Sequence, residues 1–348
     1  MRRGLMGRDE SELPVAALQA RLSRLRAGMA KAGLDAFVVY TNNVRPSAVN
    51  FLTGFTPYWS DALLLVGKDG APTFATALSK RVSEWIKTTD PVSDIANTPR
   101  PGTLIGERLA KAGAARVGVL EFDTLPAGLT DDLAAAAPKV EWTDGTALFA
   151  SLRREPDDIE RRLLARADAI AVAALDEAGA AKDAGTLAGA VEKSARLAGA
   201  EEVYVAVAPD LVAERRLNRT SQPTPLARSY AARASIAYKG AWVRRVRTFG
   251  GPAKADGWFA DVARSLQAGQ PLAVQLAAQV KSLPSATLTG WLAESCIGSY
   301  PLAAVASSRM TSAGSLASGQ FIVLTVELSL DGAPWVGTAP LIAESGSL

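Results

Sequence analysis

The chain has 348 residues, of which 48% are hydrophobic and 21% are charged, and its formal net charge is +3 at pH 7. A chain of this length ordinarily folds as two domains, and the composition is that of a soluble globular protein. The net charge is too small to indicate nucleic acid or an anionic membrane as a partner. The chain contains no histidine, which excludes Ser-His-Asp catalysis, Cys-His catalysis and zinc sites that use imidazole.

The sequence indicates a cytoplasmic protein that does not enter a membrane. Its single cysteine, Cys296, excludes an internal disulfide and is typical of a reducing compartment. Residues 1–14 begin with basic side chains and continue with acidic ones, so they lack the apolar core of a signal peptide. No stretch approaches the roughly 18 consecutive apolar residues that a membrane-spanning helix needs.

The first half of the chain alternates helical and strand-like segments. Apolar residues from Leu18 to Met29 recur at helical spacing, and Gly33 is placed to end that helix. Short apolar runs, typical of buried strands, follow at 34–40, 62–66, 72–76 and 116–122. This alternation predicts an α/β domain over residues 14–150.

The second half has a different order of elements. The polar segment 151–158 contains a proline and is suited to a domain boundary, and a long helix is expected from Pro156 to about Gly179. A second helix is expected at about 186–198. Strand-like segments then lie at 203–207, 230–238, 242–249, 321–330 and 341–343. Two helices followed by a largely antiparallel sheet predict an α+β domain over residues 151–348.

Several segments resemble, in the same order, the creatinase/aminopeptidase P family. The most specific is 238–249, which resembles a hairpin that in this family ends in Gly-Tyr-x-x-Asp-x-x-Arg-Thr-Phe. Weaker matches lie at 21–36, 50–55, 152–160, 319–327 and 341–346. The resemblance implies an α/β N-terminal creatinase-like domain, residues 14–150, followed by an α+β pita-bread domain, residues 151–348.

The resemblance also places arginines where the family has two metal-binding aspartates. The first aspartate of the hairpin falls at Arg233 and the second at Arg244. Two unit charges about 4 Å apart interact by roughly 4 kcal/mol at an intermediate dielectric constant. A dication would therefore be repelled at positions where the family attracts one. We expect no bound metal, no cofactor and no metallopeptidase activity.

The other three metal ligands of the family are mostly absent as well. The family histidine falls near Gly298-Ser299, and the second late glutamate falls at about Gly337. The first late glutamate is matched by Glu327 in the local sequence, although a strict count places Thr325 there. At best one of the five ligands is retained.

An arginine-rich stretch is the strongest candidate for a binding site. Residues 211–248 contain eight arginines and one lysine, whereas their single acid is Glu214. Guanidinium groups bind carboxylates and phosphates bidentately, so Arg233, Arg244 and Arg247 suggest a pocket for a small anion. The alternative is that these arginines pair with acids from elsewhere in the chain or point into solvent.

Three further residues are candidates for the same site. Tyr238 lies at the midpoint of the predicted hairpin, where its hydroxyl could donate a proton or a hydrogen bond, and Ser299 lies in the region of the family histidine. Both are predicted ligand contacts. Glu327 has two interpretations: it forms a salt bridge with an arginine, or it is a general base, provided that burial raises its pKa.

These observations favour one function and leave two others open. The leading hypothesis is a metal-free protein that binds a small anionic or amino-acid-like ligand. The second is a metal-independent hydrolase or lyase that acts on a C–N bond or an acidic C–H. The third is a non-catalytic subunit or scaffold. The resemblance further implies a homodimer, or a heterodimer with a homologue, formed through the second domain, with neither nucleic acid nor membrane as partner.

Overall fold

The chain forms two compact units, each with its own sheet. The computed structural model describes residues 8–57, 60–310, 314–343 and 346–347, so the basic first residues and part of the segment 341–346 lie outside the described residues. One unit contains the described residues up to Arg154 together with Cys296–Ala303. The other contains Glu155–Ser295 together with Ala304–Leu348. Among the described residues, no helix is both long enough and apolar enough to cross a membrane.

The N-terminal unit is built on a mixed sheet whose strand order is β4-β3-β2-β1-β5-β6. Its strands are β1 (Ala36–Thr41), β2 (Ala62–Gly67), β3 (Thr73–Thr76), β4 (Asp94–Asn97), β5 (Arg116–Val119) and β6 (Glu141–Asp144). Its α-helices are α1 (Val15–Ala32), α2 (Ser47–Thr53), α3 (Ser83–Thr89), α4 (Pro101–Lys111), α5 (Ala127–Ala136) and α6 (Thr146–Arg153), with 3-10 turns at Lys80–Val82 and Phe122–Thr124. Strand β1 is buried along its whole length. Its side chains alternate between two apolar clusters, one on each face of the sheet.

Helix α1 shows how the local sequence fixes an element of this unit. Its residues Leu18, Leu22, Leu25 and Met29 are all buried, as their spacing predicts. The helix ends because Gly33 adopts a left-handed conformation at φ 66°, and the backbone N–H of Leu34 then donates to the carbonyl of Met29 at 2.9 Å.

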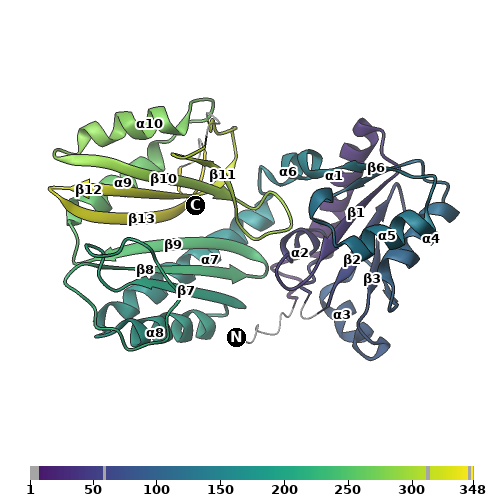
Figure 1. The fold of residues 1–348 in the computed structure, drawn as a ribbon, viewed down its shortest axis with the longest axis horizontal. Coiled ribbons are helices and arrows are strands. Elements are labelled where there is room, and N and C mark those ends of the chain that lie inside the picture. The colour runs from purple at the N-terminus through teal and green to yellow at the C-terminus, as the bar shows by residue number, and fades with distance from the viewer. Residues whose placement is uncertain (1–7, 58–59, 311–313, 344–345, 348) are drawn as a thin grey trace. The chain divides into compact units, whose positions relative to one another are not determined.

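The second unit is built on a large sheet whose strand order, in the described residues, is β11-β10-β12-β13-β9-β8-β7 (Figure 1). Its strands are β7 (Glu202–Ala208), β8 (Tyr230–Tyr238), β9 (Ala241–Phe249), β10 (Ala286–Ser295), β11 (Ala303–Ser307), β12 (Phe321–Leu330), β13 (Ala333–Ile342) and β14 (Gly346–Ser347), which pairs with β13. Its helices are α7 (Asp158–Glu177), α8 (Ala184–Leu197), α9 (Ala253–Ser265) and α10 (Leu272–Gln279), with 3-10 turns at Ala178–Ala180 and Val280–Ser282. The two helices at the start of this unit and the mainly antiparallel sheet are confirmed, whereas α9 and α10, which lie between β9 and β10, were not predicted.

Polar side chains start the two helices that open this unit. Asp157 accepts a hydrogen bond from the backbone N–H of Glu160 at 2.9 Å, and Asp183 accepts one from that of Thr186 at 2.8 Å. Each carboxylate satisfies a backbone donor that the first helical turn leaves unpaired. The following helices, α7 and α8, contact β7, β8 and β9 and so cover one face of the sheet, which we call the helix face.

The β8–β9 hairpin determines which side chains share a face. Its two-residue turn, Lys239-Gly240, has positive φ at both positions, 48° and 78°, and the register then pairs Tyr230 with Phe249 and Tyr238 with Ala241. Because successive side chains of a strand point to opposite faces, the residues of this hairpin divide into two sets. Arg245 lies on the helix face, where it pairs with Asp168 of α7. We call the opposite side the arginine face, because Arg233 and Arg244 lie on it.

The join between β9 and β13 divides the sheet into two halves. The one paired position in the register of these strands, within the described residues, is Thr338 with Val246. Two residues further along each strand, the hydroxyl of Thr248 donates to the carbonyl of Val336 at 2.8 Å and accepts from the N–H of Val336 at 3.0 Å. A side chain therefore takes the place of backbone pairing at this point. We call this junction the seam.

Candidate functional site

Arg233 and Arg244 are diagonal neighbours on the arginine face. Arg233 lies opposite Val246 and Arg244 lies opposite Ser235, so the two arginines do not pair directly across the hairpin. Diagonal neighbours of this kind are about 7–8 Å apart, which long side chains bridge easily. The hairpin thus places two cations on one face of the sheet, as diagonal neighbours and not as the direct cross-strand pair that the sequence left open.

Arg244 has an acidic partner from a distant strand. Its Nη1 forms an ion pair with Oε2 of Glu294 on β10, and its Nε donates to the hydroxyl of Ser235 at 3.0 Å. The side chains of Arg244 and Glu294 are 20% and 9% exposed. Since β13 and β12 separate β9 from β10 in the strand order, this ion pair reaches over two strands. For Arg244, therefore, the alternative of an acid from elsewhere in the chain is correct.

Arg233 has no such partner. Within the described part of the chain no acceptor bonds to its guanidinium, and its Nε is buried without a hydrogen bond. Burial is the main cause that lowers the pKa of Arg233, and the charges of Arg244 and Arg219 lower it further, whereas Glu294 opposes them. A buried donor without an acceptor costs free energy, about 1–3 kcal/mol. The half-buried Arg233 is therefore the cation in this site that lacks an anion.

Two threonines lie in the same row of the sheet as Arg233. The register pairs residues across four strands in the order Arg233, Val246, Thr338 and Thr325. The hydroxyls of Thr325 and Thr338 are 2.8 Å apart, so one donates to the other and the second O–H is left to donate elsewhere. The family's first late glutamate corresponds to Glu327 by local sequence or to Thr325 by a strict count, and Thr325 is the one that lies in this row. Gly337, one residue from Thr338, lies on the helix face.

An aromatic pair borders the arginine site. Tyr204, which lies opposite Ser235, stacks on Trp242 with ring centroids 5.8 Å apart and an interplanar angle of 13°. The guanidinium of Arg219 lies over the ring of Tyr204 at 4.4 Å, a cation–π contact. These flat surfaces add an apolar wall beside the unpaired charge of Arg233.

Two of the predicted ligand contacts, Arg247 and Tyr238, lie on the helix face instead. Arg247 forms an ion pair with Asp176 of α7, and Tyr238 is approached by the guanidinium of Arg166, 5.9 Å from its ring centroid. The physical reason is the two-residue period of a strand, which turns both side chains away from Arg233. We correct the predicted pocket accordingly: Arg247 and Tyr238 are not part of it.

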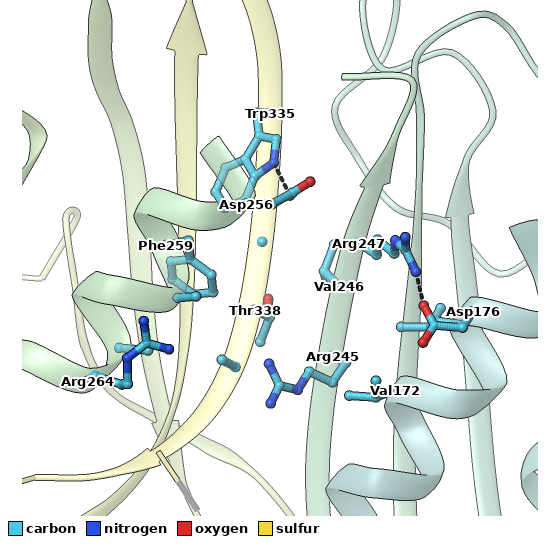
Figure 2. A pocket seen from close by; sticks show the side chains of 15 residues that line it. Val172, Asp176, Arg245, Val246, Arg247, Asp256, Phe259, Arg264, Trp335 and Thr338 are labelled. Atoms are coloured by element: carbon cyan, nitrogen blue, oxygen red, sulfur yellow. Dashed lines mark hydrogen bonds and ion pairs between the residues drawn. The ribbon is translucent and has the colours of Figure 1, made fainter. Parts of the chain in front are cut away.

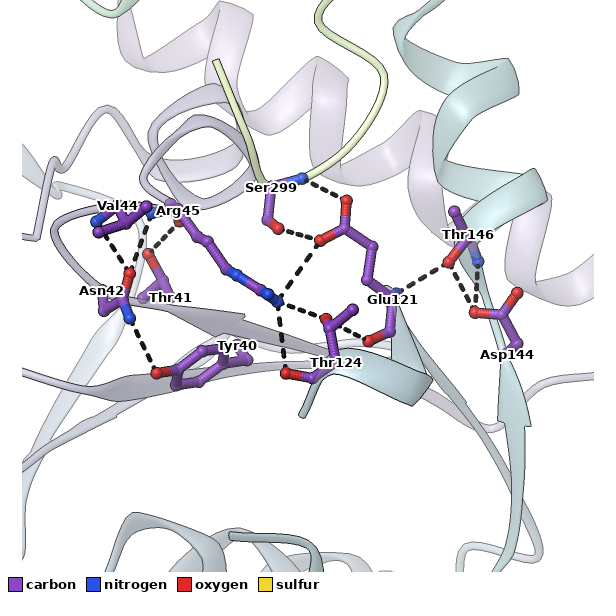
Figure 3. A network of polar contacts seen from close by, with 10 residues as sticks. All are labelled: Tyr40, Thr41, Asn42, Val44, Arg45, Glu121, Thr124, Asp144, Thr146 and Ser299. Carbon is purple, nitrogen blue, oxygen red and sulfur yellow. Dashed lines mark hydrogen bonds and ion pairs between the residues drawn. The ribbon is translucent and has the colours of Figure 1, made fainter. Parts of the chain in front are cut away.

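Ser299 belongs to the N-terminal unit. Its hydroxyl and its backbone N–H, the latter at 3.1 Å, donate to the carboxylate of Glu121, which also lies 3.8 Å from Nη1 of Arg45 (Figure 3). Glu121 itself has a positive φ of 52°, and the hydroxyl of Thr146 accepts from its N–H at 2.8 Å. This polar network explains the position of Ser299, because its hydroxyl is already bound by a carboxylate.

Glu327 fits neither of its predicted interpretations. Its side chain is exposed, and it forms no ion pair or hydrogen bond with any residue that the structure describes. Its neighbours across the strands are Gly290 and Val336, which carry no charge. The acid that approaches the arginines is instead Glu294, which the sequence analysis missed. Its signal was a carboxylate directly after the apolar residues Trp291-Leu292-Ala293.

The site does not fit a divalent metal ion. The described residues contain no group of three or more histidine, cysteine, aspartate or glutamate side chains that could hold one. Arg233 and Arg244 occupy the two positions that the resemblance assigns to metal-binding aspartates. The acid near them, Glu294, is bound to Arg244. Metal ions require carboxylate, imidazole or thiolate ligands, so the donor set here is the wrong one.

Comparisons with known proteins agree with this architecture. Residues 21–154 match the creatinase/prolidase N-terminal domain. The prolidase from Pyrococcus furiosus has a similar structure, with a TM-score of 0.69 and 16% identity, covering 94% of this chain and 98% of that one. An X-Pro aminopeptidase from Thermotoga maritima MSB8 gives a TM-score of 0.69 at 15% identity, with coverage of 94% and 95%. A Xaa-Pro dipeptidase from Bacillus anthracis gives 0.67 at 17% identity, with coverage of 95% and 96%.

By sequence alone, no curated protein matches the chain. The fold is nevertheless defined along almost its whole length: a creatinase-like α/β domain followed by a mixed α/β domain of the prolidase type. Residues 21–154 are similar to the creatinase/prolidase N-terminal domain, and the chain as a whole has the pita-bread fold of the prolidases. The predicted resemblance and fold class are confirmed.

Proposed function

We propose that this protein is a metal-free member of the fold that binds a small anionic ligand at Arg233. The observation that carries the proposal is the half-buried guanidinium of Arg233, whose Nε is buried without an acceptor in the described residues. A charged donor in such a position is stabilised when an anion supplies the missing hydrogen bonds.

The charges of the site favour a ligand with one negative charge. Arg244 and Glu294 neutralise each other, which leaves the charge of the half-buried Arg233, with the exposed Arg219 at the border of the site. The remaining O–H of the Thr325–Thr338 pair is a neutral donor in the same row of the sheet. A carboxylate, or a phosphate monoanion, matches one guanidinium fork supported by a hydroxyl. An amino-acid-like ligand would bind through its carboxylate.

A ligand screen by thermal shift tests the proposal. Carboxylates, phosphates and amino-acid derivatives are added to the unmodified protein and to Arg233→Gln, which keeps a similar length without the charge. A ligand that raises Tm of the unmodified protein should bind Arg233→Gln more weakly by about 1.5–3 kcal/mol, the range for a hydrogen bond to a charged group. Arg247→Gln is the matched control, because Arg247 lies on the other face, and it should bind normally. Equal binding by all three proteins would refute the proposal.

The other functions considered receive less support. A metal-independent hydrolase or lyase would need a base in the site, and Glu327, the predicted base, is exposed and has no partner among the described residues. Assembly as a homodimer, or with a homologue, through the second unit stays a prediction, and light scattering at micromolar concentration tests it. A subunit or scaffold role is compatible with anion binding, because the same site could regulate assembly.

A further inference from the structure

A second pocket lies on the helix face, over the seam between the two halves of the sheet. Its volume is about 480 Å³, within the range of small-molecule sites. Helix α7 forms one wall, helix α9 forms the other, and β9 and β13 form the floor (Figure 2). All of its lining residues belong to the second unit. We call it the seam pocket.

The pocket exists because the seam is loosely paired. Helix α7 packs on β8 and β9, whereas α9 packs on β13, so the two helices belong to different halves of the sheet. With Thr248 inserted between the strands, the halves are joined by few backbone bonds, and the space between α7 and α9 is left open above that junction.

The α9 side of the pocket is a fixed aromatic wall. The indole N–H of Trp335 donates to Oδ1 of Asp256 at 2.9 Å, and the ring meets that of Phe259 edge to face, with centroids 5.5 Å apart at 64°. Gly337 permits this arrangement, since a Cβ there would overlap the Trp335 ring and lie 3.2 Å from Phe259. Figure 2 shows both rings and the Asp256 carboxylate on the same side, facing Val172 of α7. Rings held in this way need no reordering when a ligand binds.

The arginines of the pocket are already neutralised. Arg245 forms two hydrogen bonds with Asp168, at 2.6 and 2.7 Å. Arg247 pairs with Asp176 across the same side, and Arg264 pairs with Asp261 on its own helix. Each guanidinium in the lining therefore has its own carboxylate, and an incoming anion would have to displace one of them.

Asp256 is the exception. Its carboxylate accepts the indole N–H of Trp335, a neutral donor, and pairs with no cation in the part of the chain that the structure describes. It is exposed and lies in the first turn of α9, where the helix N-terminus stabilises negative charge. The lining thus combines two aromatic rings, a set of apolar side chains and one carboxylate that lacks a counter-ion.

We infer that the seam pocket binds a small organic ammonium ion with an apolar body. The ammonium group pairs with Asp256 and lies against the aromatic wall, where the electron-rich ring faces attract cations. The apolar body fills the space against Val172 and Leu175 of α7. This site is independent of Arg233, because it lies on the opposite face of the sheet and has the opposite charge preference.

Calorimetric titration of the intact protein with three probes of the same shape tests the charge preference. Benzylamine carries a positive charge at pH 7, benzyl alcohol is neutral and benzoate is negative. Benzylamine should bind about tenfold more tightly than benzyl alcohol, and benzoate should bind most weakly. Asp256→Asn should remove the advantage of benzylamine over the alcohol while the asparagine oxygen still accepts from Trp335.

Two further variants control this experiment. Glu327→Gln removes an exposed carboxylate of the same unit that lies outside the pocket and pairs with no arginine of the described residues, and it should leave benzylamine binding unchanged. Ala260→Trp fills the pocket from an exposed position on α9 and should abolish binding of all three probes. The inference is wrong if benzoate binds as tightly as benzylamine, or if Asp256→Asn weakens benzylamine no more than Glu327→Gln does. Absence of benzylamine binding at about 10 mM would also refute it.

Discussion

The two faces of the large sheet carry arginines in similar number but in different states. On the helix face, Arg245 and Arg247 each meet an aspartate that α7 supplies. On the arginine face a single acid, Glu294, arrives from β10 and serves Arg244, so Arg233 stays unpaired among the described residues. The comparison teaches that the element packed against an arginine, more than the arginine's place in a basic stretch, decides whether its charge is available to a ligand.

The largest expected effect comes from separating the pair on the arginine face. Arg244→Ala should lower the free energy of unfolding by about 3 kcal/mol or more, because it leaves the Glu294 carboxylate buried without a cation. Urea denaturation measures the change. The double variant Arg244→Met/Glu294→Leu should recover most of the loss, since no buried charge is then left. A single variant as stable as the unmodified protein would show that the pair is not formed.

Glu201 offers a pH test, because the carboxylate of this buried acid, which directly precedes β7, is held by a backbone group and not by a guanidinium. The backbone N–H of Lys239 donates to both of its oxygens, at 2.9 and 2.7 Å, and burial raises its pKa from 4.5 to about 7. Because the folded state holds the proton more tightly, stability should fall as pH rises from about 4.5 to about 7. Thermal unfolding at pH 5 and pH 8 should show a drop, up to about 3 kcal/mol, that Glu201→Gln reduces.

The unpaired arginine should behave in the opposite way to Arg244. Arg233→Ala should leave the free energy of unfolding without ligand unchanged or raise it by up to about 1 kcal/mol, because it removes a buried donor without an acceptor and a like-charge neighbour of Arg244. The measurement is the same urea titration. A loss of unfolding free energy as large as that of Arg244→Ala would mean that Arg233 has a structural acid partner, and the anion site would then lose its basis.

The smallest effect is expected at the exposed pair on the helix face. The side chains of Arg247 and Asp176 are 47% and 57% exposed, and ion pairs of this kind contribute about 0–1 kcal/mol. Arg247→Ala should therefore change the midpoint of urea unfolding very little, and 0.5 M salt should reduce even that change. A loss as large as that of Arg244→Ala would erase the distinction between exposed and buried pairs on the two faces.

Local features of the fold could be predicted from the sequence because their causes are local. The apolar spacing from Leu18 to Met29, the Gly33 terminus and the Lys239-Gly240 turn each act within a few residues, and the structure contains all of them. The division of the hairpin was also within reach. Counting in twos from the turn puts Arg233 and Arg244 on one face and Arg247 on the other.

The partners of the arginines could not be predicted in the same way. Glu294 reaches Arg244 only because β12 and β13 insert between β10 and β9, and that strand order depends on long-range packing. Asp168 and Asp176 meet their arginines because α7 lies on one particular face of the sheet. The sequence therefore identified the basic stretch, whereas which arginine of the hairpin is left half-buried without an acid depended on the tertiary structure.

Thr248 gives the junction of the two halves a property that backbone pairing does not have. Ladder hydrogen bonds form with almost any residue, so they are insensitive to mutation, whereas a hydroxyl bridge disappears with one substitution such as Thr248→Val. Part of the coupling between the halves therefore depends on one side chain. Thr248→Val would remove both of these hydrogen bonds and weaken the junction, which the Thr338–Val246 pair, the Arg244–Glu294 ion pair and the shared packing of Val246 and Val336 would still hold together.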